Sequence, residues 1–420
     1  MKILYLSQYF PPEPGAPAAR VSELSRCWAE WGHDVTVLTG MPNHPTGVVP
    51  PEYRHRLFAV EDHYGARVVR TWIYAAANRG RVRRSLAYAS FAASAVALGQ
   101  ARVERPDVLV ATSPQFLCAA AGGLISRMRQ VPFVFEVRDL WPESIVAVGA
   151  LPEGHPVVRS LERVEKRLYS EATAIVVVTD TFRQKLIDRG IAPHKIFVVK
   201  NGVDLTRFNP LPRETKLRAE LGYGDRFVLA YVGTHGMAHG LGSVLDVAAR
   251  LRSRDDLRFL FVGEGAERKN LQKRASDEGL SNVKFLGALP RERMTEVYAT
   301  SDACIVPLRK TELFTSVLPS KIFEILAMER PLVLSVDGEA RELVEASGGG
   351  LYAPPEDVEA MESAILSLMG SPQRRKEMGA AGRAYVMREF DRRKLAADYL
   401  EILDEVAATG AMRAPEVSGA

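Results

Sequence analysis

Residues 137–144, Val-Arg-Asp-Leu-Trp-Pro-Glu-Ser, bring a cation, two carboxylates and an indole ring into one short segment. Arg138 offers a rigid set of N–H donors that suits phosphate or carboxylate oxygens. Asp139 and Glu143 could bind hydroxyl groups or accept a proton. Trp141 could present a flat face to a sugar ring. The alternative, which the spacing favours equally, is an internal Arg–Asp ion pair with the indole in the core.

A second polar segment, residues 315–324, reads Thr-Ser-Val-Leu-Pro-Ser-Lys-Ile-Phe-Glu. Ser320 and Lys321 would open a helix and direct a hydroxyl, an amide and an ammonium group toward a diphosphate. Glu324 lies one turn further on, and its two carboxylate oxygens suit the paired hydroxyls of a ribose. The alternative is a helix cap followed by a surface lysine and a glutamate at the edge of the core.

Both segments follow a short apolar run, and such runs alternate with helix-length segments along the whole chain. They lie at residues 2–7, 34–39, 67–72, 107–112, 133–137, 174–179, 196–199, 227–232, 258–262, 283–286, 303–306 and 332–334. Continuous apolar runs rich in Val and Ile are typical of parallel strands covered on both faces. Because the pattern occurs twice, we predict two doubly wound α/β sheets, with a polar segment at the carboxyl edge of each and a cleft between them.

The 420 residues are too many for one compact α/β core and suit two domains. An Asn-Gly pair and two prolines within residues 201–212 indicate a turn and a stiff connector. We therefore expect an N-terminal domain over 1–205 and a C-terminal domain over 206–390. An amphipathic helix is predicted over 391–408, and residues 409–420 are expected to form a flexible tail.

Two loops of the first half could also approach a ligand. In residues 7–20 a strand leads through small residues, including Gly15 and Ala16, into a helix that contains Arg20. Backbone amides at such a helix start favour an anion, although an ordinary strand-to-helix turn is equally consistent with the sequence. The next loop holds Asn43 and His44 between prolines and glycines. A histidine there could handle a proton or could simply be solvated.

Glycine-rich loops recur in the second half. Residues 233–240 contain Thr234, His235 and His239, and Glu264 lies between two glycines after the following strand. Backbone amides in such loops could hold a phosphate, with the imidazoles beside it.

Composition narrows the setting of this chemistry. The three cysteines are far apart and form no Cys-x-x-Cys pair, so neither a disulfide framework nor a zinc site is indicated. We find no signal-peptide pattern and no apolar run of about 20 residues that could span a bilayer. We therefore expect a cytoplasmic protein, with peripheral attachment to the inner face of the cytoplasmic membrane as the alternative.

The net charge of +4 is unevenly distributed, because basic residues are in excess only in the first half of the chain. Four arginines lie within the segment from Arg79 to Arg84, before an Ala-rich stretch with large apolar residues at several angles. These arginines could meet an anionic membrane surface. The equally weighted alternative is a buried helix preceded by solvated arginines.

Taken together, the segments 8–20, 42–47, 138–144, 201–204, 233–240, 262–265 and 319–327 resemble those of the retaining family-4 glycosyltransferases of the GT-B fold. The resemblance covers roughly residues 1–405. It extends to the branch that builds bacterial surface polysaccharides, with fucosaminyltransferase-like and colanic-acid-type members.

The resemblance implies an N-terminal acceptor-binding domain and a C-terminal domain that binds a nucleotide sugar, usually a UDP-sugar. Glu324 matches the glutamate that holds the donor ribose, and Ser320 with Lys321 matches a diphosphate-binding segment. Leu289 lies in the loop that meets the base, and Gly15 in the loop that faces the diphosphate. The helix at 391–408 resembles the segment that crosses back to the N-terminal domain.

Three departures from the family pattern leave the diphosphate-binding cation open. Ser316 replaces the first of two glutamates eight positions apart, Thr234 and His239 replace an arginine and a lysine, and Arg138 replaces a histidine. We assign the role of this cation to Lys321, helped by Arg138. Asp139 and Glu143 would orient the acceptor or support the developing positive charge on the sugar.

The sequence therefore predicts transfer of a sugar from a nucleotide sugar to a lipid-linked or saccharide acceptor, with retention and without a metal or other cofactor. UDP, GDP and ADP are not distinguished. Two other functions remain open: a non-hydrolysing nucleotide-sugar epimerase, and a nucleotide-sugar-binding protein without turnover.

Overall fold

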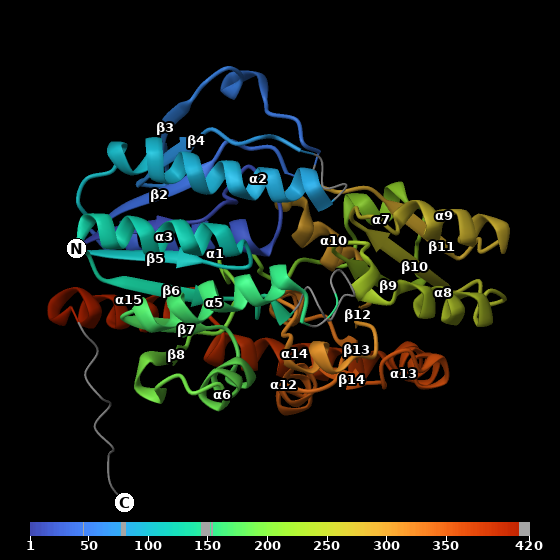
Figure 1. The fold of residues 1–420 in the computed structure, drawn as a ribbon. Helices are drawn as coiled ribbons and strands as arrows, with labels where there is room; N and C mark the ends of the chain where they lie inside the picture. Colours follow the sequence, from blue (N-terminus) through green and yellow to red (C-terminus); the bar gives the residue numbers. More distant parts are fainter. Residues whose placement is uncertain (45, 77–80, 144–151, 153, 411–420) are drawn as a thin grey trace, which may run out of the picture. The chain divides into compact units, whose positions relative to one another are not determined.

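The computed structural model describes residues 1–44, 46–76, 81–143, 152 and 154–410. The chain forms two compact units, Met1–Lys200 with Arg392–Ala420, and Asn201–Asp391. Each unit is a sheet of mostly parallel strands with helices on both faces (Figure 1). The predicted pair of doubly wound α/β domains is confirmed.

Unit 1 contains an eight-stranded sheet in the order β3-β4-β2-β1-β5-β6-β7-β8. Its strands are β1 (Lys2–Leu6), β2 (Asp34–Gly40), β3 (Phe58–His63), β4 (Ala66–Thr71), β5 (Val108–Thr112), β6 (Phe133–Val137), β7 (Ala174–Val177) and β8 (Ile196–Val198). Only β3 runs antiparallel, against β4, at one edge of the sheet. The parallel order places the carboxyl ends of β1, β5 and β6 side by side, and the polar segment 137–143 begins there.

The helices of unit 1 bury their apolar residues against the two faces of this sheet. They are α1 (Ala16–Glu30), α2 (Arg81–Ser94), α3 (Phe116–Arg129), α5 (Pro156–Glu171), α6 (Asp180–Asp188) and α15 (Arg392–Thr409). One core includes Phe91 of α2 and Leu168 of α5, and the other includes Trp28 of α1 and Tyr399 of α15.

The C-terminal helix α15 belongs to unit 1 and packs on α1. The Trp28 indole donates a hydrogen bond of 2.9 Å to the carbonyl oxygen of Ala396, and its ring lies edge-on to Tyr399 at 5.5 Å between centroids. A buried ion pair of 2.9 Å joins Arg392 to Glu23. Helix α15 therefore covers one face of the first sheet, and residues 411–420 lie outside the described chain.

Unit 2 contains a six-stranded parallel sheet in the order β11-β10-β9-β12-β13-β14. Its strands are β9 (Phe227–Val232), β10 (Leu257–Val262), β11 (Val283–Leu286), β12 (Ala303–Pro307), β13 (Leu332–Ser335) and β14 (Gly350–Tyr352). Its helices are α7 (Lys216–Glu220), α8 (Leu241–Arg250), α9 (Arg268–Asp277), α10 (Met294–Thr300), α11 (Lys321–Ala327), α12 (Glu339–Ser347), α13 (Val358–Gly370) and α14 (Pro372–Glu389).

The loops that follow β9 and β10 are joined through their backbones. The amide of Gly233 donates to Val262 at 2.9 Å, and the amide of His235 donates to Glu264 at 2.8 Å. Gly263 has φ +139°, and a Cβ atom there would overlap the carbonyl oxygen of Gly233. Glycine at position 263 is therefore required for the two loops to approach each other.

This close approach generates a stability prediction for Gly263→Ala. The added methyl group meets backbone rather than a flexible side chain, so we expect unfolding of unit 2 to become easier by more than about 3 kcal/mol. In the matched control Gly279→Ala, φ is +65° and open space surrounds the position, so the cost should be about 1 kcal/mol. Denaturant titration of both variants measures the difference, and equal losses would contradict the prediction.

Candidate functional site

In unit 1 the predicted site lies next to the buried ion pair between Arg20 and Glu136, at the end of β6. Glu136 is fully buried and accepts a hydrogen bond of 2.8 Å from Arg20 and another of 2.8 Å from the Tyr5 hydroxyl. Burial raises the pKa of Glu136, but the charges of Arg20 and Arg138 outweigh this and hold it below its usual value. The carboxylate therefore remains ionised in the interior.

Arg20, predicted to bind substrate, lies inside this network. Its guanidinium group also donates to the carbonyl oxygens of Val199 and Lys200 at 2.9 Å, and the residue is 1% exposed. Its donors point to acceptors of the protein, so the structure gives Arg20 a role in fixing the ends of β6 and β8.

Arg138 differs from Arg20 in having buried donors that no acceptor satisfies. Among the described residues, its Nε and Nη1 atoms have no hydrogen-bond partner. Its backbone amide donates to the Ser113 hydroxyl at 2.7 Å, which fixes the chain at this point. Burial lowers the pKa of Arg138 to about 10, with Glu136 opposing this shift. A buried guanidinium with unused donors is suited to an anion.

The rest of the 137–143 segment is divided between core and surface. Asp139 is half-buried, and its amide also donates to Ser113. Trp141 stacks on Phe116 with 6.2 Å between ring centroids, so the indole packs against the core. Glu143 forms ion pairs with Arg189 and, at 3.9 Å, with Lys185. The segment thus places Trp141 against the core, and Glu143 among the basic side chains of α6 and the residue that follows it.

The two loops after β1 and β2 are held together by Glu13, which the sequence analysis did not single out. One carboxyl oxygen of Glu13 accepts from the amides of Asn43 at 3.0 Å and His44 at 2.9 Å. Asn43 also donates through its side chain to Met41, so its polar groups are used internally. His44 is half-buried against Tyr9, and burial lowers its pKa.

Gly15 and Ala16 lie exposed at the start of α1, where Gly15 adopts φ +115°. Pro17 in the first turn of α1 removes one of the amides that could meet an anion. That this loop faces an anion stays a prediction.

In unit 2 the predicted site centres on Lys321 at the start of α11. Its ammonium nitrogen is buried, lies 4.2 Å from the ring centroid of Tyr231, and has no hydrogen-bond partner among the described residues. A Cβ atom on Gly233 would come within 2.5 Å of this nitrogen. Burial lowers the pKa of Lys321 to about 7, with Glu324 opposing. The site therefore contains an amine that is desolvated and has no hydrogen-bond acceptor among the described residues.

Glu324 lies one turn after Lys321, with its carboxylate held by the buried Tyr298 of α10. The Tyr298 hydroxyl donates to Glu324 at 2.8 Å. Ser320 is half-buried at the N-cap of α11, whereas Ser316 is completely buried at the end of the short helix η7 (Glu312–Ser316). Helix α11 thus carries the lysine and the glutamate in a fixed relation.

The two histidines of the glycine loop remain neutral at physiological pH. Burial, with Arg268 and Lys321 nearby, lowers the pKa of His235 to about 4, and burial with Lys321 lowers that of His239 to about 3. His235 is fully buried beside Phe261 and Phe285, which indicates a packing role. His239, at the end of the short helix η5 (Met237–His239), is half-buried.

Three further predicted contacts lie around the same loops of unit 2. Thr234 is exposed, and its carbonyl oxygen accepts from the Tyr231 hydroxyl at 2.6 Å. Glu264 is exposed and pairs with Arg268, close to Gly287. Leu289, after β11, packs at the edge of the core. Within the described chain, no group of three or more His, Cys, Asp or Glu side chains is arranged to hold a metal ion.

Comparison with known proteins gives this arrangement a family. Residues 15–202 match the model of a glycosyl transferase 4-like domain, and residues 212–385 match that of glycosyl transferases group 1. The chain is a GT-B-fold glycosyltransferase. The transferase is 25% identical over 409 residues to the putative colanic acid biosynthesis glycosyl transferase WcaI of Escherichia coli K12, covering 95% of this chain and 99% of the relative.

A second relative agrees with this assignment, and a solved structure shares the fold. The probable glycosyltransferase WbjE of Pseudomonas aeruginosa is 24% identical over 267 residues, covering 63% of the transferase and 66% of WbjE. The crystal structure of Anabaena Alr3699/HepE in complex with UDP-glucose shares the fold with a TM-score of 0.72 and 19% identity, covering 96% of this chain and 99% of that one.

Sequence reasoning missed the residues that hold the functional groups in place. Tyr231, Tyr298, Glu13 and Glu136 each contact a predicted site residue. Tyr231 and Glu136 lie within apolar runs and therefore look like core residues in the sequence. A carboxylate or a phenol inside such a run was the available signal, since buried polar groups require partners.

The buried carboxyl of Glu13 generates a pH prediction. Burial raises its pKa to about 7, although the amides of Asn43, His44 and Phe10 favour the ionised form. The folded state then retains a proton that the unfolded chain releases above its ordinary pKa of 4.5. Stability should therefore fall as pH rises from about 4.5 to about 7, by up to 1.4 kcal/mol per pH unit.

The variant Glu13→Gln should remove this contribution to the pH dependence of unfolding. Glu165 also has its pKa raised to about 7 by burial, so Glu165→Gln is the matched control. Only Glu13→Gln should change hydrogen-exchange protection at the amides of Asn43 and His44. An unchanged pH profile in Glu13→Gln would contradict the prediction.

Proposed function

We propose that the transferase moves a glycosyl group, with retention, from a UDP-sugar to a hydroxyl of a polyprenyl-diphosphate-linked or saccharide acceptor in the synthesis of a cell-surface polysaccharide. The observation that carries this proposal is the buried, unpartnered ammonium of Lys321, one turn before Glu324. The diphosphate of a nucleotide sugar supplies the missing anion, and the ribose offers hydroxyls to the glutamate.

Two relatives support the choice of donor and pathway. The HepE structure was solved with UDP-glucose, and WcaI is named for colanic acid biosynthesis. Their ligand and pathway are carried over here as part of the proposal.

We propose that Lys321 and Arg138 stabilise the departing diphosphate. As the bond to the sugar breaks, negative charge grows on the leaving oxygen, and cations fixed in a poorly solvated site stabilise this charge most in the transition state. Neither side chain needs to leave a protein partner first, since its buried nitrogens have none among the described residues. The acceptor attacks on the face from which the diphosphate departs, and a diphosphate oxygen takes the proton of the acceptor hydroxyl.

The proposed contacts fall into two groups. Gly15, Ala16, His44, Arg138 and Asp139 are the contacts proposed in unit 1. Those proposed in unit 2 are Thr234, His239, Glu264, Leu289, Ser320, Lys321 and Glu324. Arg20, Asn43, Glu143, His235 and Ser316, whose polar groups are used internally or buried, are proposed to support these residues. The reaction is proposed to need no metal ion.

The proposed activity is tested by incubating the protein with a series of UDP-sugars and a polyprenyl-diphosphate-linked sugar. We expect a glycosylated acceptor whose new bond retains the anomeric configuration, detected by mass spectrometry and NMR. Turnover should persist in chelator. Conversion of the UDP-sugar to an epimer without an acceptor would overturn the proposal, and a loss in chelator that a divalent ion restores would overturn its metal-free form.

A second prediction concerns the proton on Lys321. Because the pKa of this ammonium is lowered to about 7 in the free protein, the lysine is mostly neutral at pH 8. A bound diphosphate favours the charged form and should raise this pKa. Binding of UDP at pH 8 should therefore take up a proton, approaching one per UDP, and affinity should fall as pH rises above 7.

Calorimetry of UDP binding in buffers of different ionisation enthalpy measures this uptake. The variant Lys321→Met should weaken binding by more than about tenfold and abolish the uptake. Lys284→Met, at an exposed lysine of β11, is the matched control and should retain both. Equal proton uptake in Lys321→Met would exclude Lys321 from the diphosphate site.

A further inference from the structure

Basic residues also gather away from the site described above. In unit 1, the arginines from Arg79 to Arg84 are predicted either to meet a membrane or to precede a buried helix. Arg79 and Gly80 lie outside the described residues, and α2 is not buried all round, because Leu86 is 50% exposed. None of the helices in the described part of the chain is long and apolar enough to cross a bilayer. Attachment of this segment to a membrane stays a prediction.

A second basic cluster lies in unit 2, around a cavity of about 180 Å³. Two of the lining residues, Asp302 and Pro331, come directly before the parallel strands β12 and β13. Arg375 and Lys376 also line the cavity and come from the start of α14, which packs on α11. The cavity therefore lies at the amino edge of the second sheet, whereas the glycine loops of the candidate site follow the carboxyl ends of its strands.

Two guanidinium groups at this cavity are held in place by the backbone. Arg330 donates through Nε to the carbonyl oxygen of Tyr298 at 3.0 Å. Arg375 donates through Nη1 to the carbonyl oxygen of Met369 at 3.0 Å, and its guanidinium lies 5.2 Å from the ring centroid of Phe227. Both cations are thus fixed before a ligand arrives, which reduces the entropy that binding would cost.

These contacts leave several donors unused. Within the described chain, Nη1 of Arg330 and both Nε and Nη2 of Arg375 form no hydrogen bond, and the ammonium of the exposed Lys376 has no partner. Burial lowers the pKa of both arginines, but a guanidinium stays charged at physiological pH. The cavity therefore combines fixed positive charge with N–H groups that can still donate.

The acidic residues at the cavity already have partners. Asp302 accepts from Nε of Arg213 at 2.6 Å and from the amide of Val228 at 2.8 Å. Glu329 pairs with Arg383 at 3.8 Å. Against these two acids stand six basic residues that line the cavity or pair with its acids: Arg213, Arg218, Arg330, Arg375, Lys376 and Arg383. The surplus is local, since basic residues are in excess only in the first half of the chain.

We propose that this cavity binds a phosphate group, carried by inorganic phosphate or by a phosphate monoester. A phosphate has more oxygens than a carboxylate, so it can accept from two guanidinium groups and an ammonium at once. The volume suffices, since one water takes only about 30 Å³ in the liquid. The site lies at the other edge of the sheet from Lys321, and it does not rest on the proposed transfer reaction.

Calorimetry tests this binding with inorganic phosphate and glycerol 3-phosphate as probes. They are titrated into the full-length variant Lys321→Met, in which the proposed diphosphate site cannot account for the signal. We expect saturable binding with a Kd below about 1 mM. Tighter binding of the ester would identify a phosphorylated small molecule as the ligand, and equal or weaker binding would identify the free anion. Absence of saturation with both probes would overturn the proposal, whatever the outcome of the UDP experiments.

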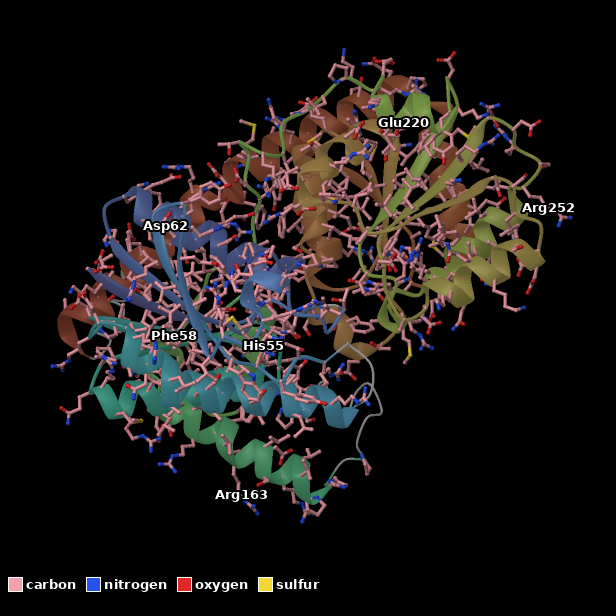
Figure 2. All side chains as sticks on the ribbon, turned by 90° about the horizontal axis from the view of Figure 1, so that it is seen from above. His55, Phe58, Asp62, Arg163, Glu220 and Arg252 are labelled. Carbon is pink, nitrogen blue, oxygen red and sulfur yellow. The ribbon has the colours of Figure 1, made fainter. Side chains whose placement is uncertain are left out.

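Variants of α14 locate the site. Lys376→Glu reverses the charge of an exposed side chain and should weaken phosphate binding by more than about tenfold, and Arg375→Gln should do the same. The matched control is Arg252→Glu, at an exposed arginine of unit 2 that Figure 2 labels, and it should bind as the parent protein does. Equal losses in Lys376→Glu and Arg252→Glu would show an effect of net charge alone and would overturn the assignment.

Diffraction gives a readout that does not depend on how the variants fold. Tungstate is a tetrahedral dianion that scatters X-rays strongly, so it can stand in for phosphate in soaked crystals of the otherwise unaltered protein. We expect a peak within hydrogen-bond distance of Arg330, Arg375 and Lys376. Peaks at other places only, including one confined to Lys321, would contradict the proposed site.

Discussion

An ammonium group held away from water without an acceptor is the constraint on which unit 2 depends. Lys321 reaches its position only because Gly233 has no side chain, and Gly233 takes its own place through a backbone contact with Gly263. The face of Tyr231 partly compensates the buried charge. The strands, the two glycine turns and α11 thus converge on a buried amine without a hydrogen-bond acceptor among the described residues, and a bound anion would stabilise its charged form.

In unit 1, by contrast, a buried charge at the end of a strand is fully paired with neighbouring side chains. Glu136, Arg20 and Tyr5 satisfy one another, so their network fixes the ends of the strands and leaves nothing for a ligand. Arg138, two residues after Glu136, shares the field of this carboxylate but keeps unused donors. The Arg20–Glu136 ion pair thus fixes the end of β6, next to Arg138. The donors of Arg20 are engaged by the protein, whereas those of Arg138 remain able to bind a ligand.

The fold was largely predictable because twelve of the fourteen strands in the described part of the chain coincide with short apolar runs of the sequence, and such runs depend on burial rather than on detailed contacts. The two strands that escaped prediction have other reasons to form. β3 is an exposed edge strand whose sequence, Phe-Ala-Val-Glu-Asp-His, is half polar, and β14 has only three half-buried residues. β3 forms because it pairs with β4, and β14 forms because it pairs with β13. Such pairing cannot be predicted from the sequence of the strand itself.

The site was predictable where a motif marks a loop and unpredictable where tertiary contacts decide which atoms remain free. Lys321 and Arg138 could be named from their segments, but their lack of partners could not. Arg20 and Arg138 have the same chemistry, and only the structure shows that the donors of Arg20 are engaged by acceptors of the protein. The lowered pKa of Lys321 likewise depends on burial by segments far away in the sequence.

The division of unit 1 into two stretches of sequence has a consequence for biosynthesis. Unit 2 is one continuous stretch and can fold as soon as it has left the ribosome, whereas α15 is made after unit 2. Until then Trp28 of α1 and Tyr5 of β1 lack the part of their cover that α15 supplies. A nascent chain therefore exposes part of this apolar core until α15 has been made, and we expect chaperones to bind during this interval.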